Sequence, residues 1–345
     1  MKRKVLLTGA TGFLGRHLTA AFEAEHVPAV ALVRATSPWP PADWAERAGK
    51  TTAIFGSALD PTGWRDAAAQ AGIGTIIHAA AVVHHSRESV EETMRVNVEG
   101  TLQVVRAARD IGARVVLVSA GGTVGCFKRH DLVADEYAPH LDAVVGDWPY
   151  YASKLRAERE GQRLAEKLGV EFTVARLPVL LGPQDHRRRS TGHVSRILDG
   201  RMPFVPAGGI HFTDVRDVAA ALARLTRKHA FRSAYHFPGT HVTFATFCQM
   251  VGDVTGQRVD ARFAPRPLLR GVATAAERMT RYTRLPLPRW MPDPVALEMS
   301  SHFWGLGTLW THKDLHYQTR LPRQTLVDTV DWLRAQDAAA ASRAA

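Results

Sequence analysis

The feature that most limits the fold of this chain is the stretch 4–15, which reads KVLLTGATGFLG. A short apolar run leads into three glycines separated by two residues each, Gly9, Gly12 and Gly15. The first glycine permits a tight turn at a strand end, the second leaves room for a pyrophosphate, and the third lets a helix pack on the strand. The N–H groups of that helix then point at the phosphates. This spacing, directly after an apolar strand, predicts a dinucleotide-binding βαβ unit.

Apolar β-rich runs alternate with helical patterns through the first half of the chain. The expected strands cover 4–8, 29–33, 52–55, 75–78, 114–119 and 171–176, and the main expected helices cover 13–25, 88–111 and 150–168. Strands that are nearly all apolar are typical of a parallel sheet covered on both faces. We therefore predict an α/β fold: a Rossmann-like doubly wound parallel sheet with a smaller, mostly helical C-terminal lobe.

The predicted division follows the point at which this alternation loosens. Residues 1–180 form the nucleotide-binding domain, with strand and helix contributions from about 205–240, and residues 181–335 form the substrate-binding lobe. Further helices are expected at 214–229, 243–256 and 265–283. The Ala-rich end, 336–345, is expected to be a flexible tail.

Composition limits the setting in which the chain works. Of its 345 residues only Cys126 and Cys248 are cysteines, too few for a disulfide framework or a metal cluster, so a cytoplasmic protein without a metal is expected. No apolar run approaches the roughly 18 residues of a membrane-spanning helix. Nucleic acid is not an expected partner, because no basic stretch is interleaved with aromatic residues.

The net charge of +11 lies entirely in the second half. Residues 1–175 carry 20 basic and 20 acidic side chains, whereas residues 176–345 carry 24 and 13. A basic half suggests an anionic ligand or an anionic membrane surface, and a solvated arginine-rich surface is the other explanation.

The expected helix 265–283 is amphipathic and basic. On a helical wheel its apolar residues occupy one arc and its arginines the other, and Trp290 follows. Such a helix can lie on anionic lipid, which makes 265–290 a candidate peripheral membrane contact. The interpretation that the sequence favours is an ordinary surface helix whose apolar stripe packs on the substrate lobe.

The end of the second expected strand, ALVRATS, bears on the choice of dinucleotide. An Asp or Glu here would bind the ribose hydroxyls of NAD, but the chain has Arg34, with Ser37 nearby. A guanidinium suits the 2′-phosphate of NADP through charge-assisted hydrogen bonds. The sequence therefore favours NADP(H) over NAD; an arginine that merely faces water is the alternative.

The stretch YYASKLRAE, 150–158, supplies the candidate reacting groups. Tyr150 and Lys154 are four residues apart and share one face of a helix. A cation one turn away is expected to lower the pKa of the phenol from its usual value of about 10. Tyr150 can then exchange a proton with a carbonyl or alcohol oxygen while hydride moves to or from nicotinamide. Tyr151 is the weaker candidate, because its partner one turn on is Leu155.

Together with HAAA (78–81), NVEGT (97–101) and RLPVLLGP (176–183), these motifs occur in a characteristic order. From residue 3 to about 335 the chain resembles the extended short-chain dehydrogenase/reductase family, also called the NAD-dependent epimerase/dehydratase family. It is most similar to the branch with dihydroflavonol reductases and 3β-hydroxysteroid dehydrogenases. The resemblance implies cofactor-binding residues Gly9, Thr11, Gly12, Phe13, Leu14, Gly15, Ala79, Ala80, Ala81, Asn97, Tyr150, Lys154, Pro178 and Val179. It also implies a homodimer formed through helices 88–111 and 150–168.

The chain departs from the family pattern at two places. Ser57 stands where the family has an Asp that binds the adenine amino group. At the end of the fifth strand the chain reads SAGGTV, 119–124, with Ala120 at the usual catalytic serine position. Ser119 and Thr123 are therefore the candidates for the hydroxyl that polarises the substrate oxygen.

The same segment helps to choose among the reactions of the family. Gly121 and Gly122 supply no acidic residue for sugar dehydration, which leaves reversible carbonyl reduction as the main hypothesis: NADPH reduces a ketone or aldehyde, hydrophobic or anionic, to an alcohol. One alternative is a nucleotide-sugar epimerase, supported by the arginine cluster DHRRRS, 185–190, which could grip a diphosphate. Another is a non-catalytic NADP-binding regulator, in keeping with the displaced serine.

Overall fold

The structure is a computed structural model that describes residues 3–37, 39–41, 51–84, 90–200, 204–257, 262–283 and 294–344. Its centre is a seven-stranded sheet in which every neighbouring pair is parallel. In spatial order the strands are β11 (Ala234–His236), β7 (Phe172–Leu177), β5 (Arg114–Ala120), β4 (Ile73–His78), β1 (Lys4–Thr8), β2 (Ala29–Val33) and β3 (Thr52–Phe55). The chain order reverses between β1 and β4, and in such sheets ligands bind at the carboxyl edge near that point.

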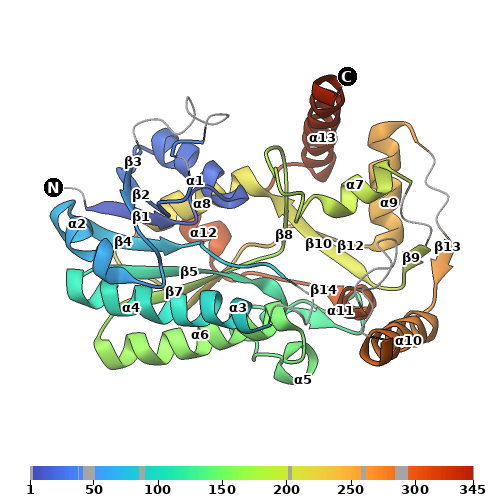
Figure 1. Cartoon of the computed structure of the whole chain (residues 1–345), viewed down its shortest axis with the longest axis horizontal. Helices are drawn as coiled ribbons and strands as arrows, with labels where there is room; N and C mark the ends of the chain where they lie inside the picture. Colours follow the sequence, from blue (N-terminus) through green and yellow to red (C-terminus); the bar gives the residue numbers. More distant parts are fainter. Residues whose placement is uncertain are drawn as a thin grey trace.

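Helices cover both faces of this sheet (Figure 1). On one face lie α1 (Phe13–Ala24), α8 (Val215–Leu225) and α12 (Thr311–Leu315), and on the other lie α2 (Arg65–Gln70), α3 (Val90–Met94), α4 (Gly100–Ile111) and α6 (Pro149–Leu168). Each face has its own apolar core, so the inner strands are buried on both sides. This arrangement confirms the predicted doubly wound fold.

The C-terminal lobe is built on a three-stranded sheet, β12 (Thr240–Thr243), β10 (Gly209–Asp214) and β8 (Val179–Leu181). Two short pairs join β9 (Phe204–Pro206) to β13 (Arg262–Ala264) and β6 (Cys126–Phe127) to β14 (Phe303–Trp304). The remaining helices are α5 (Asp142–Val145), α7 (Gly192–Leu198), α9 (Phe244–Thr255), α10 (Arg266–Thr283), α11 (Pro294–Met299) and α13 (Pro322–Ala344). The lobe thus mixes short strands with helices.

Three segments differ from the simplest expectation. The helix expected over 88–111 is interrupted, because a π-helical turn, Arg95–Glu99, separates α3 from α4. After the lobe, the chain returns to the main sheet, where Leu315 and Tyr317 join the core beneath α8. Finally, α13 continues to Ala344, so 336–344 are helical where the sequence predicted a flexible tail.

Candidate active site

The glycine loop closes tightly against the end of β4. Gly9 has a φ of +75°, a left-handed conformation that side chains other than glycine rarely adopt. A Cβ built on Gly9 would lie 2.7 Å from the amide nitrogen of Ala80 and 2.8 Å from the carbonyl carbon of Ala79. A Cβ on Gly15 would overlap the carbonyl oxygen of Gly9. The glycine loop is therefore in close contact with Ala79 and Ala80 at the end of β4.

The amino end of α1 is suited to an anion. Gly12 is its N-cap, no side chain caps the helix, and its first turn contains no acidic residue. Uncapped N–H groups and the helix dipole favour a negatively charged group at this end. Thr11, Phe13 and Leu14 lie in the same turn. These residues fit the pyrophosphate of a dinucleotide, which would lie over glycines that carry no side chain to block it.

A hydroxyl that the sequence reasoning missed ties this loop to β4. Thr8 Oγ1 is 2.8 Å from His78 Nδ1 and accepts a hydrogen bond from the amide of Ala80 at 3.1 Å. Both Thr8 and His78 are buried. Burial, followed by the nearby charge of Lys154, lowers the pKa of His78 to about 3, so the ring is neutral. A strand-end threonine beside a histidine on the neighbouring strand is the signal that could have found this contact.

Arg34 and Ser57, which the sequence predicts to bind the adenosine part of the cofactor, lie at the ends of β2 and β3. Arg34 is exposed directly after β2, and among the described residues no hydrogen bond or ion pair is recorded for its guanidinium. The Ser57 hydroxyl accepts a hydrogen bond from the amide of Leu59 at 3.2 Å, so part of its capacity is used within its own turn.

Asn97 lies in the π-helical turn and is buried. Its amide oxygen accepts from Val82 N at 2.8 Å, and its amide nitrogen donates to Val82 O and to Ser153 Oγ, both at 2.9 Å. The side chain thus fastens the loop after β4 to α6. A π-helical turn places an extra residue in the helix, and such turns are frequent at functional sites.

Tyr150 and Lys154 occupy successive turns at the amino end of α6. Lys154 is buried and its Nζ donates to the carbonyl of Val118, near the end of β5, at 2.8 Å. Burial lowers the pKa of Lys154 to about 8, and the negative charge of Glu158 opposes this shift. Burial also raises the pKa of Tyr150 to about 12. The pKa of Tyr150 therefore shifts in the direction opposite to the expected one, and burial is the cause.

The two candidate hydroxyls, Ser119 and Thr123, both point at one buried carboxylate. Ser119 donates to Glu158 Oε1 at 2.5 Å, and Thr123 donates to the same oxygen at 3.0 Å. The other oxygen, Oε2, accepts two hydrogen bonds from the Arg176 guanidinium and lies 2.9 Å from His140 Nε2. In this arrangement neither hydroxyl proton is directed at a substrate.

Glu158 and Arg176 are functional candidates that sequence reasoning missed. Both are buried, at 2% and 7% exposure. Charged residues are almost never buried without a partner. Burial alone would raise the pKa of Glu158, but the charge of Arg176 and hydrogen bonds from His140, Arg176 and Ser119 hold it at about 2. The available signal was an arginine in an apolar strand and a glutamate one turn beyond Lys154.

Aromatic side chains surround the start of α6. The rings of Tyr151 and Trp304 stack with centroids 5.1 Å apart, and Trp148 meets both from the side. A Cβ on Gly122 would overlap both Tyr151 and Trp304, so this glycine lets the rings approach the end of β5. Tyr150 contacts Tyr151 edge to face at 5.2 Å. One wall beside Tyr150 is therefore aromatic.

Two of the three clustered arginines already have partners. Arg188 forms an ion pair with Asp337 of α13, and Arg189 donates to the carbonyl of Val83 at 2.5 Å. Arg187 is exposed. One of these contacts lies within the lobe and the other connects the lobe to the segment after β4, so the cluster offers less to a diphosphate than the sequence suggests. Pro178 links β7 to β8, Val179 is the first residue of β8, and both are half-buried.

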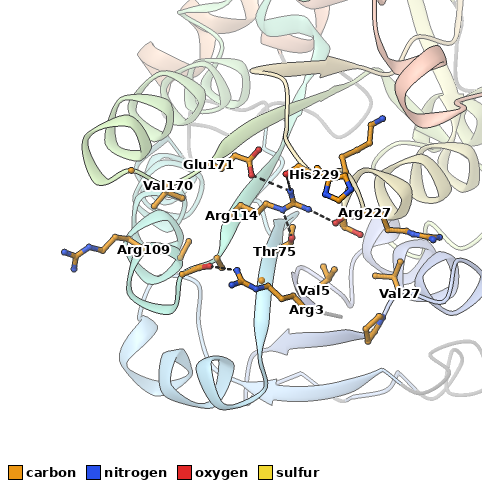
Figure 2. A pocket seen from close by; sticks show the side chains of 18 of the residues that line it. Arg3, Val5, Val27, Thr75, Arg109, Arg114, Val170, Glu171, Arg227 and His229 are labelled. Carbon is orange, nitrogen blue, oxygen red and sulfur yellow. Dashed lines mark hydrogen bonds and ion pairs between the residues drawn. The ribbon is translucent and has the colours of Figure 1, made fainter. Parts of the chain in front are cut away.

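A cavity of about 830 Å³ lies at the opposite edge of the sheet, where the strands begin (Figure 2). Its arginines satisfy carbonyls that follow helix ends: Arg114 donates to Thr226 O at 2.7 Å, and Arg3 donates to Gly112 O at 3.2 Å. Figure 2 shows Arg109 and Arg227 extending outward on either side. Since its inner cations are occupied and the glycine loop lies at the other edge, we do not assign the dinucleotide to this cavity.

A family model described as "NAD dependent epimerase/dehydratase family" matches residues 5–237. The chain belongs to this family. The match covers the glycine loop, Asn97 and the Tyr150–Lys154 pair, and it ends one residue after β11, the last strand of the main sheet. Membership confirms the predicted resemblance, and it gives the chain a nucleotide cofactor of the NAD(P) type.

Two named relatives are similar to most of this chain. Sterol demethylase protein B of Methylococcus capsulatus is 30% identical over 80% of this chain and 82% of its own length. Cinnamoyl-CoA reductase 1 of Oryza sativa subsp. japonica is 30% identical over 73% of this chain and 76% of its own. The solved structure of gox2253 superposes with a TM-score of 0.79 at 26% identity, covering 96% of this chain and 98% of that one. These matches support an NAD(P)-dependent oxidoreductase or epimerase-type activity on a small molecule.

The described residues contain no helix that combines the length and the apolar composition of a membrane-spanning segment. No group of three or more His, Cys, Asp or Glu side chains among them is placed to hold a metal ion.

The close approach at Gly15 gives a first prediction. Gly15→Ala places a methyl group against the Gly9 carbonyl, so the loop must shift, and we expect the affinity for NADPH to fall by about 10- to 100-fold, in keeping with overpacking energies of about 1–3 kcal/mol. Isothermal titration calorimetry measures this change. Gly192→Ala in α7 is the matched control, because a Cβ there meets nothing within 4 Å. Equal affinity of the Gly15 and Gly192 variants for NADPH would contradict the role of the glycine loop in binding the cofactor.

Proposed function

We propose that this chain is an NADP(H)-dependent reductase that converts a ketone or aldehyde to an alcohol. The observation that carries the proposal is the Tyr150–Lys154 pair on α6, with the ammonium held on the carbonyl of Val118 at the carboxyl edge of the sheet. The glycine loop opens at the same edge, so a nicotinamide and a substrate carbonyl can meet there. The name of one relative, cinnamoyl-CoA reductase 1, supports this direction.

The protonation states of Tyr150 and Lys154 suit proton donation. When bound, NADPH would supply the hydride that accompanies this proton. With a pKa of about 12, Tyr150 is protonated at neutral pH and can donate its proton to the substrate oxygen as negative charge develops there. With a pKa of about 8, Lys154 is still largely an ammonium and stabilises the phenolate that remains. Glu158, one turn further along, helps to keep that ammonium protonated.

Ser119 and Thr123 remain predicted as the groups that polarise the substrate oxygen, but the hydrogen bonds to Glu158 weigh against a direct role. Each hydroxyl has one proton. Ser119 donates its proton to the carboxylate, and the proton of Thr123 is shared between the carboxylate and the carbonyl of Ala120, which lies 2.9 Å from Thr123 Oγ1. In our proposal Tyr150 is therefore the principal donor to the substrate oxygen. Ser57, Ala79–Ala81, Asn97, Pro178 and Val179 keep their proposed places around the cofactor.

Arg34 gives the experiment for the choice of cofactor. Arg34→Ala removes the guanidinium proposed to bind the 2′-phosphate, so the affinity for NADPH should fall by about 10- to 100-fold, as expected for loss of a charge-assisted hydrogen bond of about 1.5–3 kcal/mol. The affinity for NADH should not change. Arg109→Ala, an exposed arginine at the other edge of the sheet, is the control. Equal affinity of the native chain for NADPH and NADH would contradict NADP selectivity.

The alternatives differ in net turnover. A nucleotide-sugar epimerase interconverts two sugars without net consumption of NADPH, and a non-catalytic regulator binds NADPH without turning it over. A panel of ketones and aldehydes with NADPH therefore separates the three. Consumption of NADPH supports the reductase, whereas sugar epimerisation with retained NAD would replace it.

A further inference from the structure

Helix α10 exposes the apolar side of an amphipathic pattern. Leu268 is 53% exposed, Val272 38%, Met279 42% and Tyr282 85%. At 100° per residue these four positions and Ala275, also exposed, fall within one narrow arc of the helix. The favoured prediction, that this stripe packs on the substrate lobe, is therefore wrong for these side chains. We call this surface the α10 face.

The position and charge of α10 indicate what kind of surface the α10 face can bind. Figure 1 places α10 at the outer edge of the lobe, beside α11 and far from the main sheet. The helix contains four arginines, Arg266, Arg270, Arg278 and Arg281, against one acidic residue, Glu277. It belongs to the half of the chain that carries the whole net charge of +11. An apolar arc on a basic helix fits a surface that is apolar inside and negatively charged outside.

We propose that the α10 face docks this protein on the surface of an anionic lipid bilayer. The helix lies in the plane of the interface, with Leu268, Val272 and Met279 entering the acyl boundary and Tyr282 at headgroup level, where aromatic rings with a polar tip are favoured. Arginines such as the exposed Arg278 add attraction to anionic headgroups. A second copy of the chain is the weaker occupant, because it would bring one basic helix against another.

Sedimentation with lipid vesicles tests this directly. The full chain is mixed with vesicles of phosphatidylcholine alone or with added phosphatidylglycerol. We expect binding only to the anionic vesicles, weakened by salt. Leu268→Asp with Val272→Asp should reduce binding at least about tenfold, since each apolar side chain entering the interface contributes on that scale. The control, Val133→Asp with Leu321→Asp, changes the same residue types at 59% and 77% exposed positions and should bind as the native chain does.

The outcomes separate the possible occupants. Equal binding of the native chain and the α10 double variant, equal binding to neutral and anionic vesicles, or no binding at all would each overturn the proposal. So would a native dimer that the double variant converts to monomer without any binding to vesicles. NADPH binding reports that each variant is folded. If the double variant does not fold, Tyr282→Asp alone, at an 85% exposed site, replaces it.

Discussion

Replacing Tyr150 by Phe lowers kcat for ketone reduction by about 10²- to 10⁴-fold, the usual contribution of a positioned general acid. The hydroxyl is lost while the ring remains, so the affinity for NADPH and the folded state should not change. Turnover is followed by the loss of reduced nicotinamide, and affinity by calorimetry. Tyr151→Phe is the matched control, because it removes the neighbouring hydroxyl but leaves the ring stacked on Trp304. Undiminished turnover by the Tyr150 variant would end the proposed role of this residue.

The same pair sets the expected pH dependence. Lys154 carries its proton below a pKa of about 8 and loses it above. Because the ammonium stabilises the phenolate left after proton donation, kcat for reduction should fall as the pH rises through about 8. Tyr150 itself stays protonated throughout that range, since its pKa is about 12. A kcat that does not change as the pH rises from neutral would show that ionisation of Lys154 does not affect the reaction.

Replacing Glu158 by Ala destabilises the fold by about 3–5 kcal/mol, the scale on which one partner of a buried ion pair is lost. The change leaves the Arg176 guanidinium buried without its carboxylate and frees the hydroxyls of Ser119 and Thr123. Urea unfolding measures the difference. Glu160→Ala is the control on the same helix, because its ion pair with Arg156 is accessible to solvent, with side chains 33% and 60% exposed, and contributes little.

The contribution of Glu158 to the stability of the fold also depends on pH. Its folded pKa, about 2, lies below the ordinary value of 4.5, so its contribution to stability is present above pH 4.5 and is lost as the pH falls toward 2. The difference in stability between the native chain and Glu158→Ala should therefore shrink over that interval. A difference in stability that does not change with pH would show that side-chain packing, and not the ionisation of Glu158, causes the loss of stability.

The sheet and the cofactor loop were predictable because their signals are local. The left-handed turn at Gly9 and the close approach at Gly15 follow from glycine spacing within one βαβ unit. The parallel strands follow from apolar runs of suitable length. Each signal lies within about 20 residues, which is the distance from the glycine loop to the end of the second strand in a βαβ unit.

The inside of the candidate site was less predictable because it depends on contacts between distant segments. Ser119 and Ala120 point to opposite faces of β5, and only the packed structure shows that the Ser119 side meets Glu158. The pKa of Tyr150 depends on how much water the neighbouring rings exclude, which no spacing reveals. The π-helical turn at Asn97 looks like uninterrupted helix in the sequence.

The seventh strand of the main sheet has a consequence for any attempt to divide the chain. β11 pairs with β7, and α8 packs beside α1, although both come after the first strand of the lobe. A fragment cut near residue 180 would leave β7 as an open edge and uncover the apolar side of α1. Such a truncated piece should aggregate instead of folding autonomously, so the nucleotide-binding half is a unit in space but not along the polypeptide.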